Sequence, residues 1–146
     1  MFGFFQTDID GFAFENEFTV GAWILGGKQG SSACAVSIES PAWKENVIRI
    51  GEYHKEGYFS ALCHRGGGPS ADMFYHLDSK STGKKLTTEQ WYHLALVRSK
   101  DKIQFFVDGD QVGRKQAGLD KGPGPLLKAR EVSGCASDIP VLVLTY

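Results

Sequence analysis

The stretch that decides the fold is Trp91-Tyr92-His93-Leu94-Ala95-Leu96-Val97, a turn at Ser99-Lys100-Asp101, and Ile103-Gln104-Phe105-Phe106-Val107-Asp108-Gly109. Two β-type runs joined by a short polar turn predict an antiparallel hairpin. The Asp108-Gly109 pair predicts a second tight hairpin, because glycine accepts a positive φ without strain. Both faces of residues 91–97 are largely apolar, which predicts a central strand with Trp91 and Phe105 in the core.

Further candidate strands lie on both sides of this stretch, separated by turn residues. Residues 18–25 are apolar at nearly every position, so we expect Trp23 in the core as well. The other expected strands are residues 33–39, 47–53, 58–63, 73–77 and 141–144. No window shows sustained helical periodicity, and no domain boundary is evident. The sequence therefore predicts an all-β fold, a two-sheet antiparallel β-sandwich, as a single domain over residues 1–146.

Composition narrows the classes of partner. The formal net charge is −1 and there is no basic run, so nothing indicates nucleic acid or an anionic membrane surface. No apolar run approaches the roughly 20 residues of a membrane span, so we expect no membrane insertion. The N-terminal residues lack the pattern of a signal peptide. Three cysteines without Cys-x-x-Cys spacing predict neither a disulfide framework nor a zinc site.

Two segments resemble the concanavalin A-like lectin/glucanase superfamily, in its laminin G-like and pentraxin-like branch. The first is Phe18-Thr19-Val20-Gly21-Ala22-Trp23-Ile24, and the second is the 91–109 stretch quoted above. Their order and spacing carry the resemblance, which covers residues 4–114 approximately. It implies a concanavalin A-like jelly roll and suggests an extracellular or cell-surface location.

The resemblance fades at both ends, which predicts shortened terminal strands. Such strands would leave sheet edges open, and a second copy of the chain could satisfy their backbone groups. With the apolar run at residues 141–144, this favours a homodimer. The alternative is that the tail folds back and closes its own sandwich.

The acidic residues do not form a convincing catalytic pair. Asp8 and Asp10, like Glu15 and Glu17, have i, i+2 spacing but lie in no clear β run, and neither pair has a third acid in step. We therefore expect no catalytic residues and no enzyme activity. No metal ligands or cofactor are predicted, although Asp8 and Asp10 leave calcium open.

Aromatic and polar residues near loops supply the candidate ligand-binding residues. Sugar rings stack their apolar faces on aromatic planes, while nearby polar groups bind their hydroxyls. Trp43 lies in a polar loop close to Asn46, and His64 precedes the Gly66-Gly67-Gly68 run. The full candidate set is Trp43, Asn46, Tyr53, His64 and Tyr75.

The function expected from these features is a non-catalytic, lectin-like module that binds a glycan. The alternative is a protein–protein interaction or assembly module of laminin G-like type. A divergent glycoside hydrolase or lyase is the third hypothesis. The sequence names neither the sugar nor the protein partner.

Overall fold

The computed structural model describes residues 6–14, 17–26, 34–39, 46–53, 56–65, 73–99, 102–116, 127–133 and 141–144. These residues form β-strands and one short 3-10 helix, and they contain no α-helix. The strands are β1 (Gln6–Phe14), β2 (Phe18–Leu25), β3 (Cys34–Glu39), β4 (Asn46–Tyr53), β5 (Tyr58–Arg65), β6 (Met73–Asp78), β7 (Trp91–Ser99), β8 (Lys102–Val107), β9 (Asp110–Gln116), β10 (Leu127–Ser133) and β11 (Val141–Leu144). The 3-10 helix η3 (Lys80–Thr82) lies between β6 and β7. The described residues contain no helix with the length and hydropathy of a membrane span.

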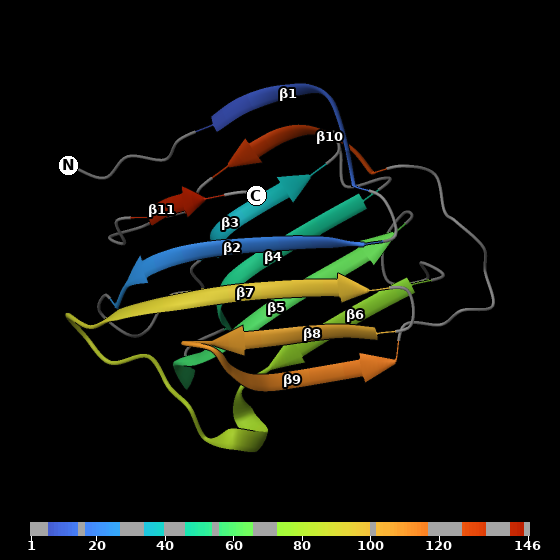
Figure 1. The fold of residues 1–146 in the computed structure, drawn as a ribbon. Coiled ribbons are helices and arrows are strands. Elements are labelled where there is room, and N and C mark those ends of the chain that lie inside the picture. The colour runs from blue at the N-terminus through green and yellow to red at the C-terminus, as the bar shows by residue number, and fades with distance from the viewer. Residues whose placement is uncertain are drawn as a thin grey trace.

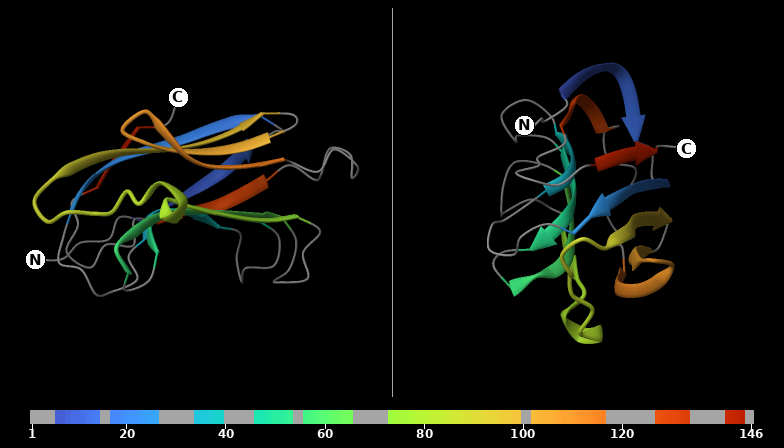
Figure 2. Two further views of the ribbon diagram at one scale, coloured as in Figure 1. Left: turned by 90° about the horizontal axis from the view of Figure 1, so that it is seen from below. Right: turned by 90° about the vertical axis from the view of Figure 1, so that its left-hand side faces the viewer.

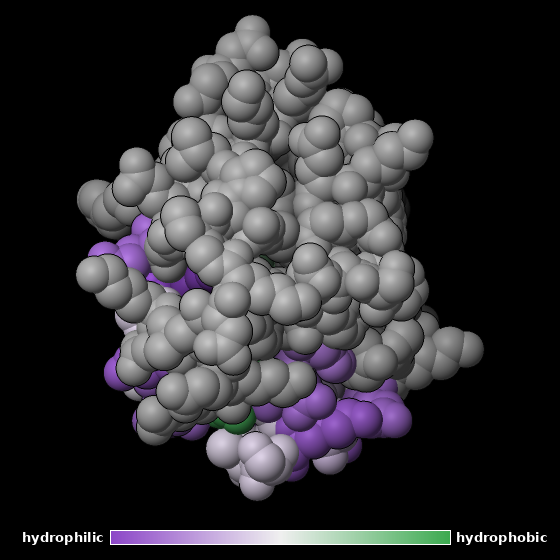
Figure 3. Space-filling model, turned by 90° about the vertical axis from the view of Figure 1, so that its right-hand side faces the viewer, coloured by the Kyte–Doolittle hydropathy of each residue, from purple (hydrophilic) through white to green (hydrophobic). Residues whose placement is uncertain are grey.

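The strands form two antiparallel sheets that pack face to face, as the sequence predicts (Figures 1 and 2). The six strands of sheet A follow the order β1-β10-β3-β4-β5-β6, and the five strands of sheet B follow the order β11-β2-β7-β8-β9. The result is a concanavalin A-like jelly-roll sandwich. At the end of the sandwich shown in Figure 3, the described residues that reach the surface are mostly hydrophilic.

The core lies between the two sheets and follows the period-two alternation of the strands. Along β8, every second side chain is buried, from Ile103 through Phe105 to Val107. Sheet A contributes Val36, Ile48, Ile50, Phe59, Ala61, Cys63 and Leu77 to the same apolar cluster. The prediction for Phe105 is confirmed, since its side chain is fully buried.

The prediction that Trp23 and Trp91 lie in the core is wrong. Their residues are 42% and 48% exposed, respectively. On β7 the buried residues are Tyr92, Leu94 and Leu96, so the alternate residue Trp91 faces outward. An apolar residue on each side of a strand looks like double coverage in the sequence, but the outer face of sheet B leaves both indoles about half exposed.

The first and the last strand of the chain are edge strands of the two sheets. β1 pairs with β10 over the length of sheet A's edge, and β11 pairs with β2 from Val141↔Ile24 to Leu144↔Gly21. The tail therefore folds back onto its own sandwich, which was the alternative to the homodimer. The unpaired tail that favoured a homodimer is not present, and the dimer stays a prediction without that support.

Gly26 holds the segment before β7 against the end of β2. Its N–H donates to the Gln90 carbonyl at 2.7 Å, and its carbonyl accepts from the Glu89 N–H at 2.8 Å. A Cβ on Gly26 would lie 1.9 Å from the carbonyl oxygen of Thr87. Only glycine allows this approach of the two backbones, and the approach fixes where β7 begins.

The Asp108-Gly109 pair forms the tip of the β8–β9 hairpin, as predicted. Both residues have positive φ, 53° and 83°, the signature of a two-residue type I′ turn. The Asp108 carboxylate accepts a hydrogen bond from the His93 N–H at 2.8 Å, and the Lys84 ammonium lies 3.4 Å from it. The turn is therefore tied to β7 and to the segment after η3.

Gly109→Val should lower the free energy of unfolding by at least about 1 kcal/mol, because a β-branched residue is strained at positive φ. Gly109→Asn is the control, since asparagine tolerates this conformation. Urea denaturation of the two variants measures the difference. Equal stability of both variants would show that positive φ at this position is not required.

Gly26→Ala should destabilise the protein by about 1–3 kcal/mol or more, because the new methyl group collides with backbone that cannot rotate away. Gly21→Ala, in the same strand, is the matched control, since its Cβ would have no neighbour closer than 3.4 Å. Thermal melting of both variants tests this. A Gly26→Ala variant as stable as Gly21→Ala contradicts the close approach.

Cys63 makes the stability of the core depend on pH. Burial raises the pKa of its thiol from 9.0 to about 11, and the nearby Arg98 guanidinium offsets part of this rise. The folded chain therefore keeps a proton that the unfolded chain loses between pH 9 and 11. Because the folded state binds more protons in this window, stability is complete below pH 9 and falls as the pH rises through it.

Cys63→Ala should remove this component of the pH dependence. The difference in unfolding free energy between wild type and variant should be constant below pH 9 and shift in favour of the variant between pH 9 and 11. Urea denaturation across the range measures both. Parallel stability profiles would contradict the burial of a neutral thiol.

Candidate functional site

Four of the five sequence-predicted ligand-binding residues lie on three neighbouring strands of sheet A. Asn46 and Tyr53 are the end residues of β4, His64 is in β5, and Tyr75 is in β6. Trp43 lies outside the described residues, as do the side chains of the other four.

The backbone register shows which of these positions come together. Asn46 is opposite Arg65, His64 is opposite Val47 and Phe74, and Tyr75 is opposite Cys63. Asn46, His64 and Tyr75 therefore belong to one end of the sheet. Tyr53, opposite Tyr58, belongs to the other end.

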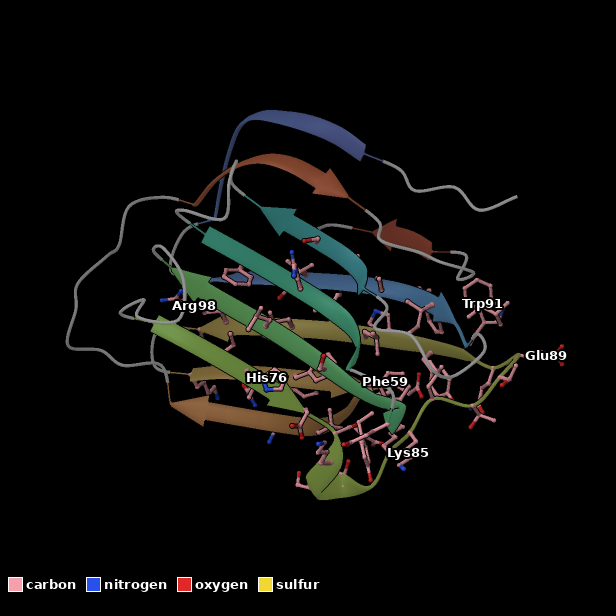
Figure 4. All side chains as sticks on the ribbon, turned by 180° about the vertical axis from the view of Figure 1, so that it is seen from behind. Phe59, His76, Lys85, Glu89, Trp91 and Arg98 are labelled. Carbon is pink, nitrogen blue, oxygen red and sulfur yellow. The ribbon has the colours of Figure 1, made fainter. Side chains whose placement is uncertain are left out.

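A row of described side chains crosses the sheet between these two ends. Its members are paired directly from strand to strand: Ser37 on β3, Arg49 on β4, Leu62 on β5 and His76 on β6. Each of the last three alternates with buried core residues, so the row belongs to the outer face of sheet A. Figure 4 views the molecule from the side of this sheet, with His76 on β6.

The row carries hydrogen-bonding groups that are partly withdrawn from water. The Ser37 residue is fully buried although it lies on the outer face, and its Oγ accepts a hydrogen bond from Arg49 Nε at 3.2 Å. This bond holds the Arg49 guanidinium beside Ser37. Arg49, Leu62 and His76 are partly exposed.

The adjacent row is made of small and polar residues. Gly51 is opposite Ser60, which is opposite Asp78. Asp78 accepts a hydrogen bond from the backbone N–H of Lys80 at 3.0 Å, which fixes its carboxylate at the edge strand β6. The two rows together place a cation, an imidazole, hydroxyls, an apolar patch and a carboxylate on one sheet face.

The polar row was missed by sequence reasoning. Its one local signal is Arg49 between Ile48 and Ile50, because a charged residue alternating with buried residues belongs to the solvent side of a strand. Joining Arg49 to Ser37 and His76 requires the register of four strands, which no single segment contains.

The row of Ser37, Arg49, Leu62 and His76 contains no carboxylate. Asp8 and Asp10 are in β1, which is at the opposite edge of sheet A from β6. Within the described part of the chain, no group of three His, Cys, Asp or Glu residues could hold a metal ion. The chemistry that this face offers is hydrogen bonding, apolar contact and interaction with the charges of Arg49 and Asp78.

The two antiparallel sheets form a jelly-roll β-sandwich with a polar row on one outer face. Residues 4–134 match the family model of the concanavalin A-like lectin/glucanases superfamily, and the chain belongs to this superfamily. No curated protein matches the sequence.

Solved structures of several glycan-binding and laminin domains share the fold. The galectin LEC-6 of Caenorhabditis elegans has a TM-score of 0.54 and 12% identity over 95% of this chain and 86% of that chain. The CBM40 domain of the Ruminococcus gnavus IT-sialidase, bound to α2,3-sialyllactose, has a TM-score of 0.58 and 10% identity, covering 89% and 78%.

The LG4-5 domains of the mouse laminin α1 chain have a TM-score of 0.55 and 14% identity over 99% of this chain and 44% of that chain. At these identities the similarity establishes the fold and leaves the ligand open.

Proposed function

We propose that residues 1–146 form one non-catalytic carbohydrate-binding module whose ligand lies on the outer face of sheet A. The observation that carries the proposal is the row Ser37, Arg49, Leu62 and His76, which crosses four adjacent strands. A sheet that served only to cover the core would not need a buried serine bonded to an arginine on its outer face.

The chemistry of the row suits a saccharide. A guanidinium presents several fixed N–H donors, which match a ring bearing many hydroxyls. The His76 imidazole is partly exposed at the β6 end of the row, although its Nε2 atom is buried. The Leu62 side chain gives an apolar contact for the C–H face of a sugar in the middle of the row. Ligand pockets commonly combine apolar lining with a few placed polar groups.

Residues identified from the sequence extend this site in the proposal. His64 lies two positions from Leu62 along β5, and Asn46 lies three positions from Arg49 along β4. Trp43 lies in the connection that leads into β4. We assign stacking to Trp43 and Tyr53. Tyr75 is opposite the core residue Cys63, so its strand position belongs to the inner face of sheet A and it is not part of this site. Asn46 and His64 would bind sugar hydroxyls.

Known members of the fold support a glycan as ligand. The CBM40 domain was solved with sialyllactose, and domain 4 of the arabinanase AbnA from Geobacillus stearothermophilus was solved with arabinotriose. A hydrolase is less well supported, because retaining glycosidases need two carboxyl groups about 5–5.5 Å apart and the row has none.

A protein ligand is the second candidate, and the laminin LG4-5 similarity favours it. A laminin G-like assembly module would use a sheet face or edge without requiring a sugar. Under this second candidate function, the partner could be a second copy of the chain, which would form a homodimer through such a surface.

Arg49→Met should weaken glycan binding about tenfold or more, because a charge-assisted hydrogen bond contributes roughly 1.5–3 kcal/mol. A glycan array with and without calcium identifies the ligand, and calorimetry then measures its affinity. Trp43→Ala should weaken the binding of the same ligand while leaving the melting temperature of the protein nearly unchanged.

Lys102→Met is the control, since it removes one positive charge from the opposite sheet. If Arg49→Met and Lys102→Met bind the glycan with equal affinity, the ligand does not bind to the outer face of sheet A. An array without any hit, together with a concentration-dependent dimer in sedimentation, would favour the assembly module.

A further inference from the structure

The outer face of sheet B carries a second surface that shares no residue with the row on sheet A. Trp23 and Trp91 are the large hydrophobic residues that the described part of the chain leaves exposed. In the register of β2 and β7, Trp23 is opposite His93 and Leu25 is opposite Trp91. Trp23 and Trp91 are therefore diagonal neighbours on one face, and strand geometry places the Cα atoms of such neighbours about 7–8 Å apart.

The Trp23 side of this surface is held in place by its neighbours. The Trp23 and His93 rings lie 5.1 Å apart, tilted by 44°. The imidazole Nε2 would lie 3.4 Å from a Cβ on Gly21, so the absent side chain gives the ring room to lie close to the strand. The His93 backbone is bonded in both directions to Asp108 at 2.8 Å, which anchors this part of β7 to the hairpin turn.

The Trp91 side is held in place by the segment before β7, whose residues Glu89 and Gln90 are hydrogen-bonded to the backbone of Gly26. Glu89 has a φ of 61°, a conformation rare for a residue other than glycine, and its N–H donates to the Gly26 carbonyl. Figure 4 shows Glu89 and Trp91 at the same end of the molecule. Backbone strain of this kind persists where the surroundings enforce it, commonly beside ligand sites. The backbone conformation of Glu89 sets the position of Trp91, which is the first residue of β7.

Polar residues border the indoles along the sheet and at its end. Glu89 and Gln90 are exposed directly before Trp91, and Asp108 is exposed beyond His93. The amide side chains of Gln104 and Gln111 are hydrogen-bonded to each other farther along the same sheet. The surface is thus a small aromatic centre with carboxylate and amide groups around it.

This composition fits a saccharide better than a second protein. A stable protein interface buries about 800 Å² on each partner, and two half-exposed indoles would supply only a small part of that area. A sugar chain is narrow, with apolar C–H faces and hydroxyls at its edges. The flattest such chains are β-linked pyranoses with all substituents equatorial, because every axial position on both ring faces then bears hydrogen.

We propose that Trp23, Trp91 and His93 form a second saccharide-binding surface, which stacks a β-linked chain of all-equatorial hexopyranoses across the outer face of sheet B. The two indoles contact successive parts of one oligosaccharide. Glu89, Gln90 and Asp108 bind hydroxyls at its edges. This surface does not depend on the proposed site on sheet A.

The test uses cellohexaose as the probe and α-linked maltohexaose, whose chain is curved, as the control sugar. Calorimetry with the full chain should show binding of cellohexaose. Trp23→Ala and Trp91→Ala should each weaken it about tenfold, the effect expected for removing one ring's apolar contact. Arg49→Met should leave this affinity within about twofold, because its side chain is on the other sheet.

Two further measurements keep the test independent of folding defects. Trp23→Phe and Trp91→Phe retain a ring and should keep more affinity than the alanine variants. In a Trp43→Phe background, where Trp23 and Trp91 are the remaining tryptophans, cellohexaose should protect the fluorescence from acrylamide quenching.

Several results would overturn the proposal. The proposal is wrong if cellohexaose does not bind, or if maltohexaose binds with the same affinity. It is also wrong if both alanine variants keep the wild-type affinity for cellohexaose, or if Arg49→Met is the one variant that loses binding. A wild-type dimer that Trp23→Ala and Trp91→Ala convert to monomer would assign the surface to a second copy of the chain.

Discussion

The pairing of β2 with β7 is the constraint on which the rest of the structure depends. The two strands are paired without a register shift from Phe18↔Arg98 to Leu25↔Trp91, although the 65 residues 26–90 separate them in the chain. Each strand buries alternate residues, so a slip of one position would turn Leu94 and Leu96 outward and bring the tryptophans inward. The backbone contact of Gly26 with Thr87 and Gln90 opposes such a slip, because it fixes where β7 begins relative to the end of β2.

Both candidate surfaces follow from the same alternation. Once Ile48 and Ile50 point into the core, Arg49 must be on the outer face of sheet A, and once Tyr92 and Leu94 point inward, Trp91 and His93 must be on the outer face of sheet B. The two faces then differ in chemistry. The one on sheet A is polar and partly buried, with Ser37 bonded to Arg49, and the one on sheet B is aromatic and exposed.

The sequence was sufficient where the signal is local. The Asp108-Gly109 turn, the buried face of β8 and the two-sheet class could all be predicted, because turn chemistry and period-two alternation are visible within a few residues. Trp23 and Trp91 were assigned to the core because apolar residues on both sides of a strand cannot show which side is covered. The terminal strands and the row of Ser37, Arg49 and His76 depend on pairing between distant segments. For example, β1 pairs with β10 near the other end of the chain. Asn46, Tyr53, His64 and Tyr75 lie on strands of sheet A in the structure, and only the register separates Tyr53 from the others.

The arrangement of the two surfaces has a consequence for how the module would engage a polysaccharide. Packed sheets lie about 10 Å apart, and the outer faces point in opposite directions. A short sugar chain that lies flat on one face cannot reach the other without bending around an edge of the sandwich. The two surfaces would therefore take different chains, or distant parts of one long chain, and an avidity gain would require a ligand dense enough to offer both. With ligands of different chemistry on the polar and the aromatic face, the module would connect two kinds of saccharide, and each face would be altered by substitutions that leave the other intact.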